Sequence, residues 1–72
     1  MSKKYLYKRL GEKIVTVRKQ HKLSQEQLAL LSYVDRTYLA RIEEGKANPS
    51  VRILHKLARN LKIKIHQLLE GI

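Results

Sequence analysis

The sequence of 72 residues contains no cysteine, a single proline and only six acidic residues. Without cysteine, neither disulfides nor a thiolate metal site can stabilise the chain, which favours an intracellular, cytoplasmic domain held together by packing. No long apolar run follows the basic amino terminus, because lysine and arginine recur through residue 22. The sequence therefore predicts neither a signal peptide nor a membrane-spanning helix.

Groups suited to catalysis or metal binding are also scarce. The histidines His21, His55 and His66 lack the spacing of a metal site, which needs several converging ligands. No glycine-rich phosphate loop is present, and no nucleophile is accompanied by a base and an orienting acid. We therefore expect no metal, no cofactor and no enzymatic activity, and we interpret Ser24 and Ser32 as a cap and a turn residue.

Size and charge narrow the choice of partner. We expect one domain, residues 1–72, in which residues 1–4 form a basic flexible arm. A domain this small buries only about 60% of its unfolded surface, so a deep catalytic cleft is not expected. The formal net charge is +10. This charge favours a polyanion, nucleic acid ahead of an anionic membrane, although a basic surface that serves only solubility has the same composition.

The spacing of apolar residues predicts two helices in the first half of the chain. The first runs from Tyr5 to Gln20, and its apolar stripe is Leu6, Leu10, Ile14 and Val17. Gly11 inside this helix costs up to about 1 kcal/mol relative to alanine, which indicates either close packing or a frayed first half. Ser24 and Gln27 then form a capping box for a second helix from about Gln25 to Ser32. Its expected core residues are Leu28, Ala29 and Leu31.

A third helix, about residues 36–44, is predicted within the stretch DRTYLARIEEG. Asp35 can cap its first free amides, and Gly45 can supply a left-handed stop. Successive residues about 100° apart divide this helix into two arcs. The inward arc holds Tyr38, Leu39, Ile42 and Glu43. The outward arc, which is suited to reading base edges, holds Arg36, Thr37, Ala40, Arg41 and Glu44. The short connection before Asp35 gives the two helices helix-turn-helix spacing.

The second half of the chain adds two further helices. Asn48 or Ser50 can start a fourth helix beside the single proline. Its apolar stripe is Val51, Leu54, Leu57, Ala58 and Leu61. A last short helix is expected over Ile65 to Leu69. Because no internal repeat or sufficiently long strand-like alternation is present, the predicted fold class is all-α with five helices.

Two segments resemble a known family. LSQEQLA at residues 23–29 and YLARIEEGKANPS at residues 38–50 are similar to the Cro/repressor (XRE) type of helix-turn-helix domain, found in phage repressors and many bacterial regulators. The likeness extends from about Leu10 to Leu69 and implies a compact, lambda-repressor-like DNA-binding domain. The segment DRTYLARIE at residues 35–43 is also similar to the small controller proteins of restriction-modification systems.

This resemblance implies a DNA-binding role for single residues. The recognition helix, about residues 36–44, would enter the major groove and contact bases through Arg36, Thr37 and Arg41. For each of them a phosphate contact or a solvated position remains the alternative. The residues expected at the DNA backbone are Ser24, Gln25, Tyr38, Lys46 and Asn48. For Gln25, which opens the second helix, the alternative is helix capping.

Two further expectations concern the scaffold. Glu43 falls on the inward arc, where an unpaired carboxylate would be costly. In related domains the matching arginine and glutamate form a buried ion pair, so Arg18 and Glu43 are expected to be structural. Tyr33 departs from the family, which usually has glycine or another residue that tolerates a positive φ at this turn. Tyrosine there would be strained, or the turn would be reshaped.

The last residues suggest an interface between two copies of the chain. Ile63, Leu68 and Leu69 match core positions, which leaves Ile65 and Ile72 as candidate exposed residues of a homodimer interface. The alternative is that both isoleucines complete the core. A dimer of this type reads a two-fold operator with half-sites about 34 Å apart, or a multiple of that distance.

The combined prediction is a regulator of transcription that binds specific sequences of double-stranded DNA as a homodimer on an inverted repeat. It would repress by covering a promoter or activate by touching RNA polymerase. A restriction-modification controller is a narrower option within this class. The main alternative is an antitoxin or other protein-interaction module with secondary DNA binding. A further alternative is a nucleic-acid binder that uses charge alone.

Overall fold

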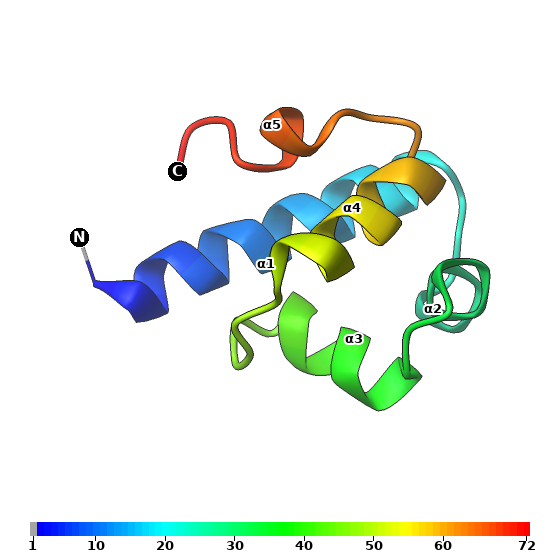
Figure 1. Ribbon diagram of the computed structural model, residues 1–72, viewed down its shortest axis with the longest axis horizontal. Helices are drawn as coiled ribbons and strands as arrows, with labels where there is room; N and C mark the ends of the chain where they lie inside the picture. The colour runs from blue at the N-terminus through cyan, green and yellow to red at the C-terminus, as the bar shows by residue number, and fades with distance from the viewer. Residues whose placement is uncertain (1) are drawn as a thin grey trace.

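The computed structural model describes residues 2–72 and contains five helices (Figure 1). They are α1 Lys3–Gln20, α2 Gln25–Ser32, α3 Arg36–Glu43, α4 Val51–Asn60 and α5 Ile65–Leu68. Because these residues include no strand, the predicted all-α class with five helices is confirmed. In this part of the chain no helix is both long enough and apolar enough to cross a membrane.

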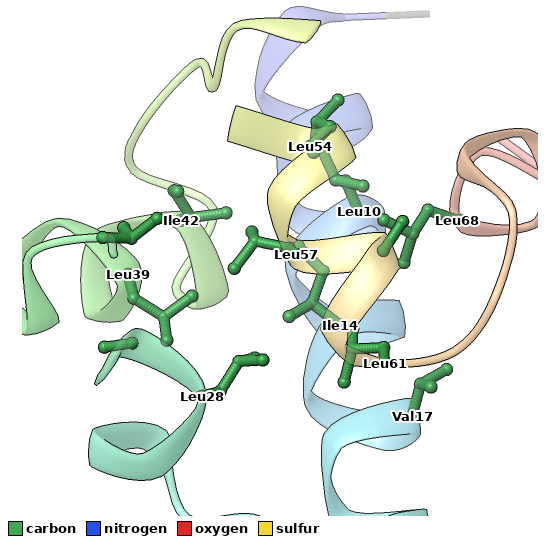
Figure 2. Packing of buried hydrophobic residues seen from close by; sticks show 13 residues of the cluster. Leu10, Ile14, Val17, Leu28, Leu39, Ile42, Leu54, Leu57, Leu61 and Leu68 are labelled. Atoms are coloured by element: carbon green, nitrogen blue, oxygen red, sulfur yellow. The ribbon is translucent and has the colours of Figure 1, made fainter. Parts of the chain in front are cut away.

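The helices are arranged around α1 and α4. Helices α2 and α3 lie on one side of this central pair, and α5 lies on the other (Figure 1). One hydrophobic core joins them (Figure 2). Its buried members are Leu10, Ile14, Val17, Leu28, Ala29, Val34, Leu39, Ile42, Leu54, Leu57, Ala58, Leu61 and Leu68. The arrangement leaves one flank of α3 without a covering helix.

The prediction that residues 1–4 form a flexible arm is wrong for residues 2–4, which the structure describes. Helix α1 begins at Lys3, and the Ser2 hydroxyl accepts a hydrogen bond from the Tyr5 amide at 3.2 Å. This N-cap extends the helix two residues beyond its predicted start, so that Lys3 and Lys4 lie on a helix. Met1 lies outside the described residues.

Three residues that were predicted to face the core, Leu31, Val51 and Leu69, are exposed instead, and Val51 is 67% exposed at the first position of α4. Leu31 is 51% exposed, and Ser32 is buried in its place, where its hydroxyl accepts a bond from Asn60 Nδ2 at 3.2 Å. Leu69 is 44% exposed, whereas Ile65 and Ile72 are half-buried against the core. The left-handed Gly71 (φ +80°) turns the chain back after α5, and the Ile72 amide donates to the Leu69 carbonyl. In the isolated chain both isoleucines therefore complete the core, which was the alternative to an exposed interface.

The turn after α2 keeps its left-handed geometry in spite of Tyr33. Tyr33 has φ 54° and ψ 42°, and its side chain is 89% exposed. The Val34 amide donates to the Ala29 carbonyl at 2.9 Å, and the Tyr33 amide donates to the Leu30 carbonyl at 3.2 Å. This is a Schellman motif with tyrosine where glycine is usual. The turn is therefore strained rather than reshaped, and it directs the chain into α3.

The surroundings of Gly11 show close packing rather than a frayed first half of α1. A Cβ atom at this position would lie 2.5 Å from the carbonyl oxygens of both Ile42 and Glu43. The backbones of α1 and α3 therefore approach each other more closely than any residue with a side chain allows.

Candidate nucleic-acid interface

The start and the orientation of α3 are fixed by its own sequence. Asp35 Oδ1 accepts hydrogen bonds from the amides of Thr37 at 2.7 Å and Tyr38 at 3.4 Å. Leu39 and Ile42 are 0% and 1% exposed, and both point into the core (Figure 2). The helix ends at Glu43, one residue before the predicted end. Its opposite side is thereby turned to solvent.

This outward side carries the predicted base-contact residues. Arg36, Thr37 and Arg41 are all exposed. Arg36 and Thr37 line a shallow groove together with Ala40 and with Gln25 from the first turn of α2. The fold therefore brings one predicted backbone-contact residue beside two predicted base-contact residues. Guanidinium, hydroxyl and amide groups of this kind are the ones that bind base edges and phosphates.

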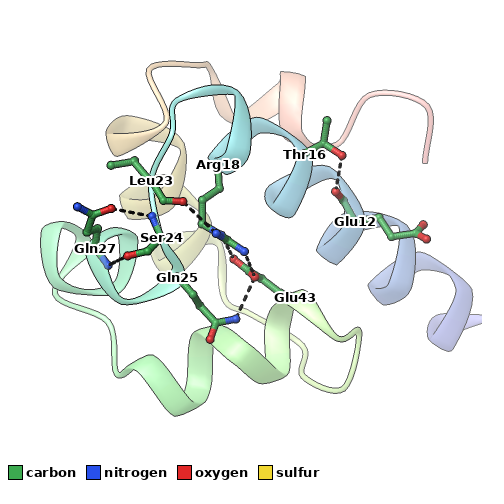
Figure 3. A network of polar contacts seen from close by, with 8 residues as sticks. All are labelled: Glu12, Thr16, Arg18, Leu23, Ser24, Gln25, Gln27 and Glu43. Atoms are coloured by element: carbon green, nitrogen blue, oxygen red, sulfur yellow. Dashed lines mark hydrogen bonds and ion pairs between the residues drawn. The ribbon is translucent and has the colours of Figure 1, made fainter.

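The predicted ion pair is present beneath this surface (Figure 3). Arg18 Nε lies 2.8 Å from Glu43 Oε2, and Arg18 Nη2 lies 3.0 Å from Glu43 Oε1. Arg18 Nη1 also donates to the Leu23 carbonyl at 2.9 Å. The two side chains are only 11% and 4% exposed. This fork geometry ties α1, the connection before α2, and α3 together.

Gln25 is connected to the same carboxylate, a contact that sequence reasoning missed. Its Nε2 donates to Glu43 Oε1 at 3.0 Å (Figure 3). Capping of α2 is carried out by its neighbours instead, since Ser24 Oγ accepts from the Gln27 amide and Gln27 Oε1 accepts from the Ser24 amide. A glutamine amide has two N–H groups, so one remains for a phosphate. No sequence pattern could have indicated this contact, because it depends on how α2 lies across α3.

The remaining candidates lie on α3, in the loop that follows it and at the start of α2. Arg41 Nη2 donates to the Lys46 carbonyl at 3.0 Å, so this arginine braces the loop as well as facing solvent. Lys46 and Asn48 are exposed, and Tyr38 is half-buried against the core. Ser24 is exposed at the start of α2.

Positive charge dominates the chain as a whole. Among residues 2–72 the Arg18–Glu43 contact is the only ion pair between side chains, and the chain carries sixteen lysines and arginines. Over the same residues, no three histidine or acidic side chains converge in a way that could hold a metal ion. The other cations are therefore available to an anionic partner.

Comparisons with known proteins find related sequences over most of this chain. A profile of the helix-turn-helix family matches residues 14–68. The control protein C.MunI of a Mycoplasma species is 40% identical over 65 residues, which covers 89% of this chain and 88% of that protein. The chain spans 39% and 50% of the length of two further curated relatives, the first of them an immunity repressor of Bacillus phage phi105.

Solved structures show the same fold. The restriction-modification controller protein C.AhdI from Aeromonas hydrophila is 37% identical, with a TM-score of 0.84 over 86% of this chain and 94% of that chain. SinR, a master regulator of biofilm formation solved in complex with DNA, is 34% identical, with a TM-score of 0.82 over 85% of this chain and 98% of that chain.

Proposed function

The chain belongs to the helix-turn-helix family, and from this membership we propose that it regulates transcription by binding specific sequences of double-stranded DNA. The observation that carries the proposal is the exposed groove where Arg36 and Thr37 on α3 meet Gln25 on α2. One helix supplies side chains for base edges, and the start of the other supplies an amide for the backbone. C.MunI and C.AhdI, which match over most of their own length, make a restriction-modification controller the narrower form of the proposal.

In this proposal Arg36 and Arg41 contact guanine, and Thr37 contacts a thymine methyl or donates a hydrogen bond. Gln25, Ser24, Tyr38, Lys46 and Asn48 hold the sugar-phosphate backbone and fix the register. Support comes from the exposure of the arginines and the loop residues.

The proposed active form is a homodimer on an inverted repeat. An apolar groove between α1, α4 and the carboxyl end supports it, because Leu6, Pro49, Leu69 and Ile72 line this groove. The exposed Leu69 replaces Ile65 as the main expected contact, and Ile72 contributes its exposed part. Burial of this patch against a second copy would join two recognition helices in one two-fold assembly.

Two effects on transcription follow from DNA binding. A bound dimer represses when its operator overlaps a promoter, and it activates when it contacts RNA polymerase beside one. Both take place in the cytoplasm, the compartment that holds DNA in bacteria such as those from which the named relatives come.

Selection of binding sites from randomised duplexes at about 150 mM salt tests the proposal. The enriched duplex is then titrated against scrambled DNA with wild type, Arg36→Ala and Arg59→Ala. Arg59 is an exposed arginine near the end of α4 and provides the matched control. We expect an inverted repeat, and Arg36→Ala should lower the preference for it by about 1–3 kcal/mol per half-site. The control should keep the preference. Equal binding of wild type to all duplexes would refute specific recognition.

A second candidate function is an antitoxin or other protein-interaction module with secondary DNA binding. It is favoured by three neighbouring exposed residues, Leu30, Leu31 and Tyr33, which are 76%, 51% and 89% exposed. Large apolar side chains gathered at a surface are typical of protein contacts. This function predicts weak binding to every duplex and no enriched repeat in the same selection.

A further inference from the structure

A second basic groove borders the recognition surface and shares the loop residues Lys46 and Asn48 with it. It runs between the first turns of α1 and the loop after α3, and its lining includes Lys4, Tyr7, Lys8, Glu44, Lys46 and Asn48. The α1 residues of this groove have no role in the interface described above. The groove is open rather than enclosed by the fold, so it suits an extended ligand at the surface.

The two walls of this groove are held together by a backbone contact. Gly45 has φ +76°, and a Cβ atom there would lie 2.7 Å from the Cα atom of Lys8. Glycine therefore allows the loop to rest directly on the α1 backbone. Since Arg41 of α3 also donates to the Lys46 carbonyl of this loop, the groove is continuous with the recognition helix. A ligand held here is kept in a fixed position relative to α3.

The charges of this groove are arranged for an anion. Three lysines line it against one glutamate, and none of them forms an ion pair within the described chain. The first turn of α1 has no acidic residue, although the helix dipole favours acidic side chains there. Lys3 and Lys4 occupy that turn and oppose the dipole. In the described chain neither lysine is paired with a carboxylate, so both charges are available to a bound anion.

We infer that this groove binds the sugar-phosphate backbone of the DNA beyond the segment that α3 reads. This inference rests on the proposed function. Lys4 and Lys8 would neutralise phosphates on the far side of the loop, while Lys46 and Asn48 hold the backbone nearer to α3. Helix α1 is thus part of the DNA-binding surface as well as a support for it. Contacts of this kind carry no sequence information, but they add to the salt dependence of binding.

The test compares Lys4→Gln/Lys8→Gln with Lys62→Gln/Lys64→Gln. The control pair removes the same charge from the connection between α4 and α5, on the side of the molecule away from α3 (Figure 1). Dissociation constants for the selected duplex and for scrambled DNA are measured from about 50 to 200 mM salt. The α1 variant should lower the slope of log affinity against log salt by about 1.8 for each bound protomer, equally for both duplexes. The control should leave the slope close to that of wild type.

A shortened duplex tests whether Lys4 and Lys8 contact the flanking DNA or only raise the overall charge of the protein. When the base pairs flanking the selected site are removed, the salt slope of wild type should fall by as much as the α1 substitutions lower it on the long duplex. The slope of the α1 variant should then be the same on the short and the long duplex. Equal slopes for the α1 variant and the control on the long duplex would overturn the inference, even if the operator preference of wild type is intact. If wild type itself binds the selected duplex no better than scrambled DNA, the proposed function is refuted instead. Thermal unfolding of each variant verifies that it is folded.

Discussion

Replacing Glu43 by glutamine tests whether the buried ion pair holds the domain together. Glu43→Gln keeps the shape of the side chain but removes its charge and turns one acceptor oxygen into a donor. The wild-type carboxylate is 4% exposed and accepts from Arg18 Nε, Arg18 Nη2 and Gln25 Nε2. In the variant the guanidinium of Arg18, itself 11% exposed, retains its charge without a counter-ion.

The expected cost is large for a domain of this size. Removing one partner of a buried pair destabilises by about 3–5 kcal/mol. A chain of 72 residues has a total stability of about 4–11 kcal/mol at typical values per residue. A loss of about 3 kcal/mol lowers the melting temperature by roughly 12–24 °C in a domain this small. The variant is therefore expected to be partly unfolded in warm buffer.

Urea titration followed by far-UV circular dichroism measures this loss. Glu44→Gln is the matched control, because Glu44 is the next residue and is exposed. It should change the free energy of unfolding by less than about 0.5 kcal/mol. Arg18→Met combined with Glu43→Leu removes both charges, and it should recover most of the stability that Glu43→Gln loses. A loss below about 1 kcal/mol for Glu43→Gln would refute the reasoning, because it would equal that of an exposed pair.

Two further substitutions test the backbone geometry. Gly11→Ala should destabilise by about 1–3 kcal/mol in a thermal melt, although alanine is the better helix former, because its Cβ would meet two carbonyl oxygens of α3 at 2.5 Å. An unchanged or higher melting temperature would contradict this close packing. Tyr33→Gly should stabilise by up to about 1 kcal/mol, because it relieves a left-handed residue at φ 54° whose side chain is 89% exposed. A lower melting temperature in that variant would show that the tyrosine ring stabilises the turn.

The beginnings of the middle helices could be predicted from sequence because their signals are local. Ser24, Asp35 and Ser50 all accept bonds from amides in the first turn of the helices that follow them. Each such bond is specified within about four residues of chain. The short apolar stripes were less informative, since a window of eight residues cannot fix which side of α2 faces α4. This is why Leu31 was assigned to the core in place of Ser32.

Helix ends and contacts between helices could be predicted only in part. Gly45 signals its left-handed stop, but Lys22 and Lys62 adopt φ of 56° and 58° at equivalent helix ends with no glycine to indicate it. The contact of Gln25 with Glu43 and that of Arg41 with the Lys46 carbonyl arise only after the helices are packed. Residue type and spacing therefore predicted candidates for the interface but not the contacts that orient them.

Under the proposed function, the contact between α1 and α3 couples the stability of the domain to its recognition of DNA. An eight-residue helix such as α3 is not stable alone in water, so its position depends on what it packs against. Gly11, the Arg18–Glu43 pair and the contact of Gly45 with Lys8 all set the position of α3 relative to α1. A bulkier residue at Gly11 must displace α3, whereas glutamine at Glu43 chiefly removes a charge. Well below its melting temperature, Gly11→Ala should therefore lose operator preference while it remains folded, because a displacement of about 1 Å is enough to misalign bidentate base contacts.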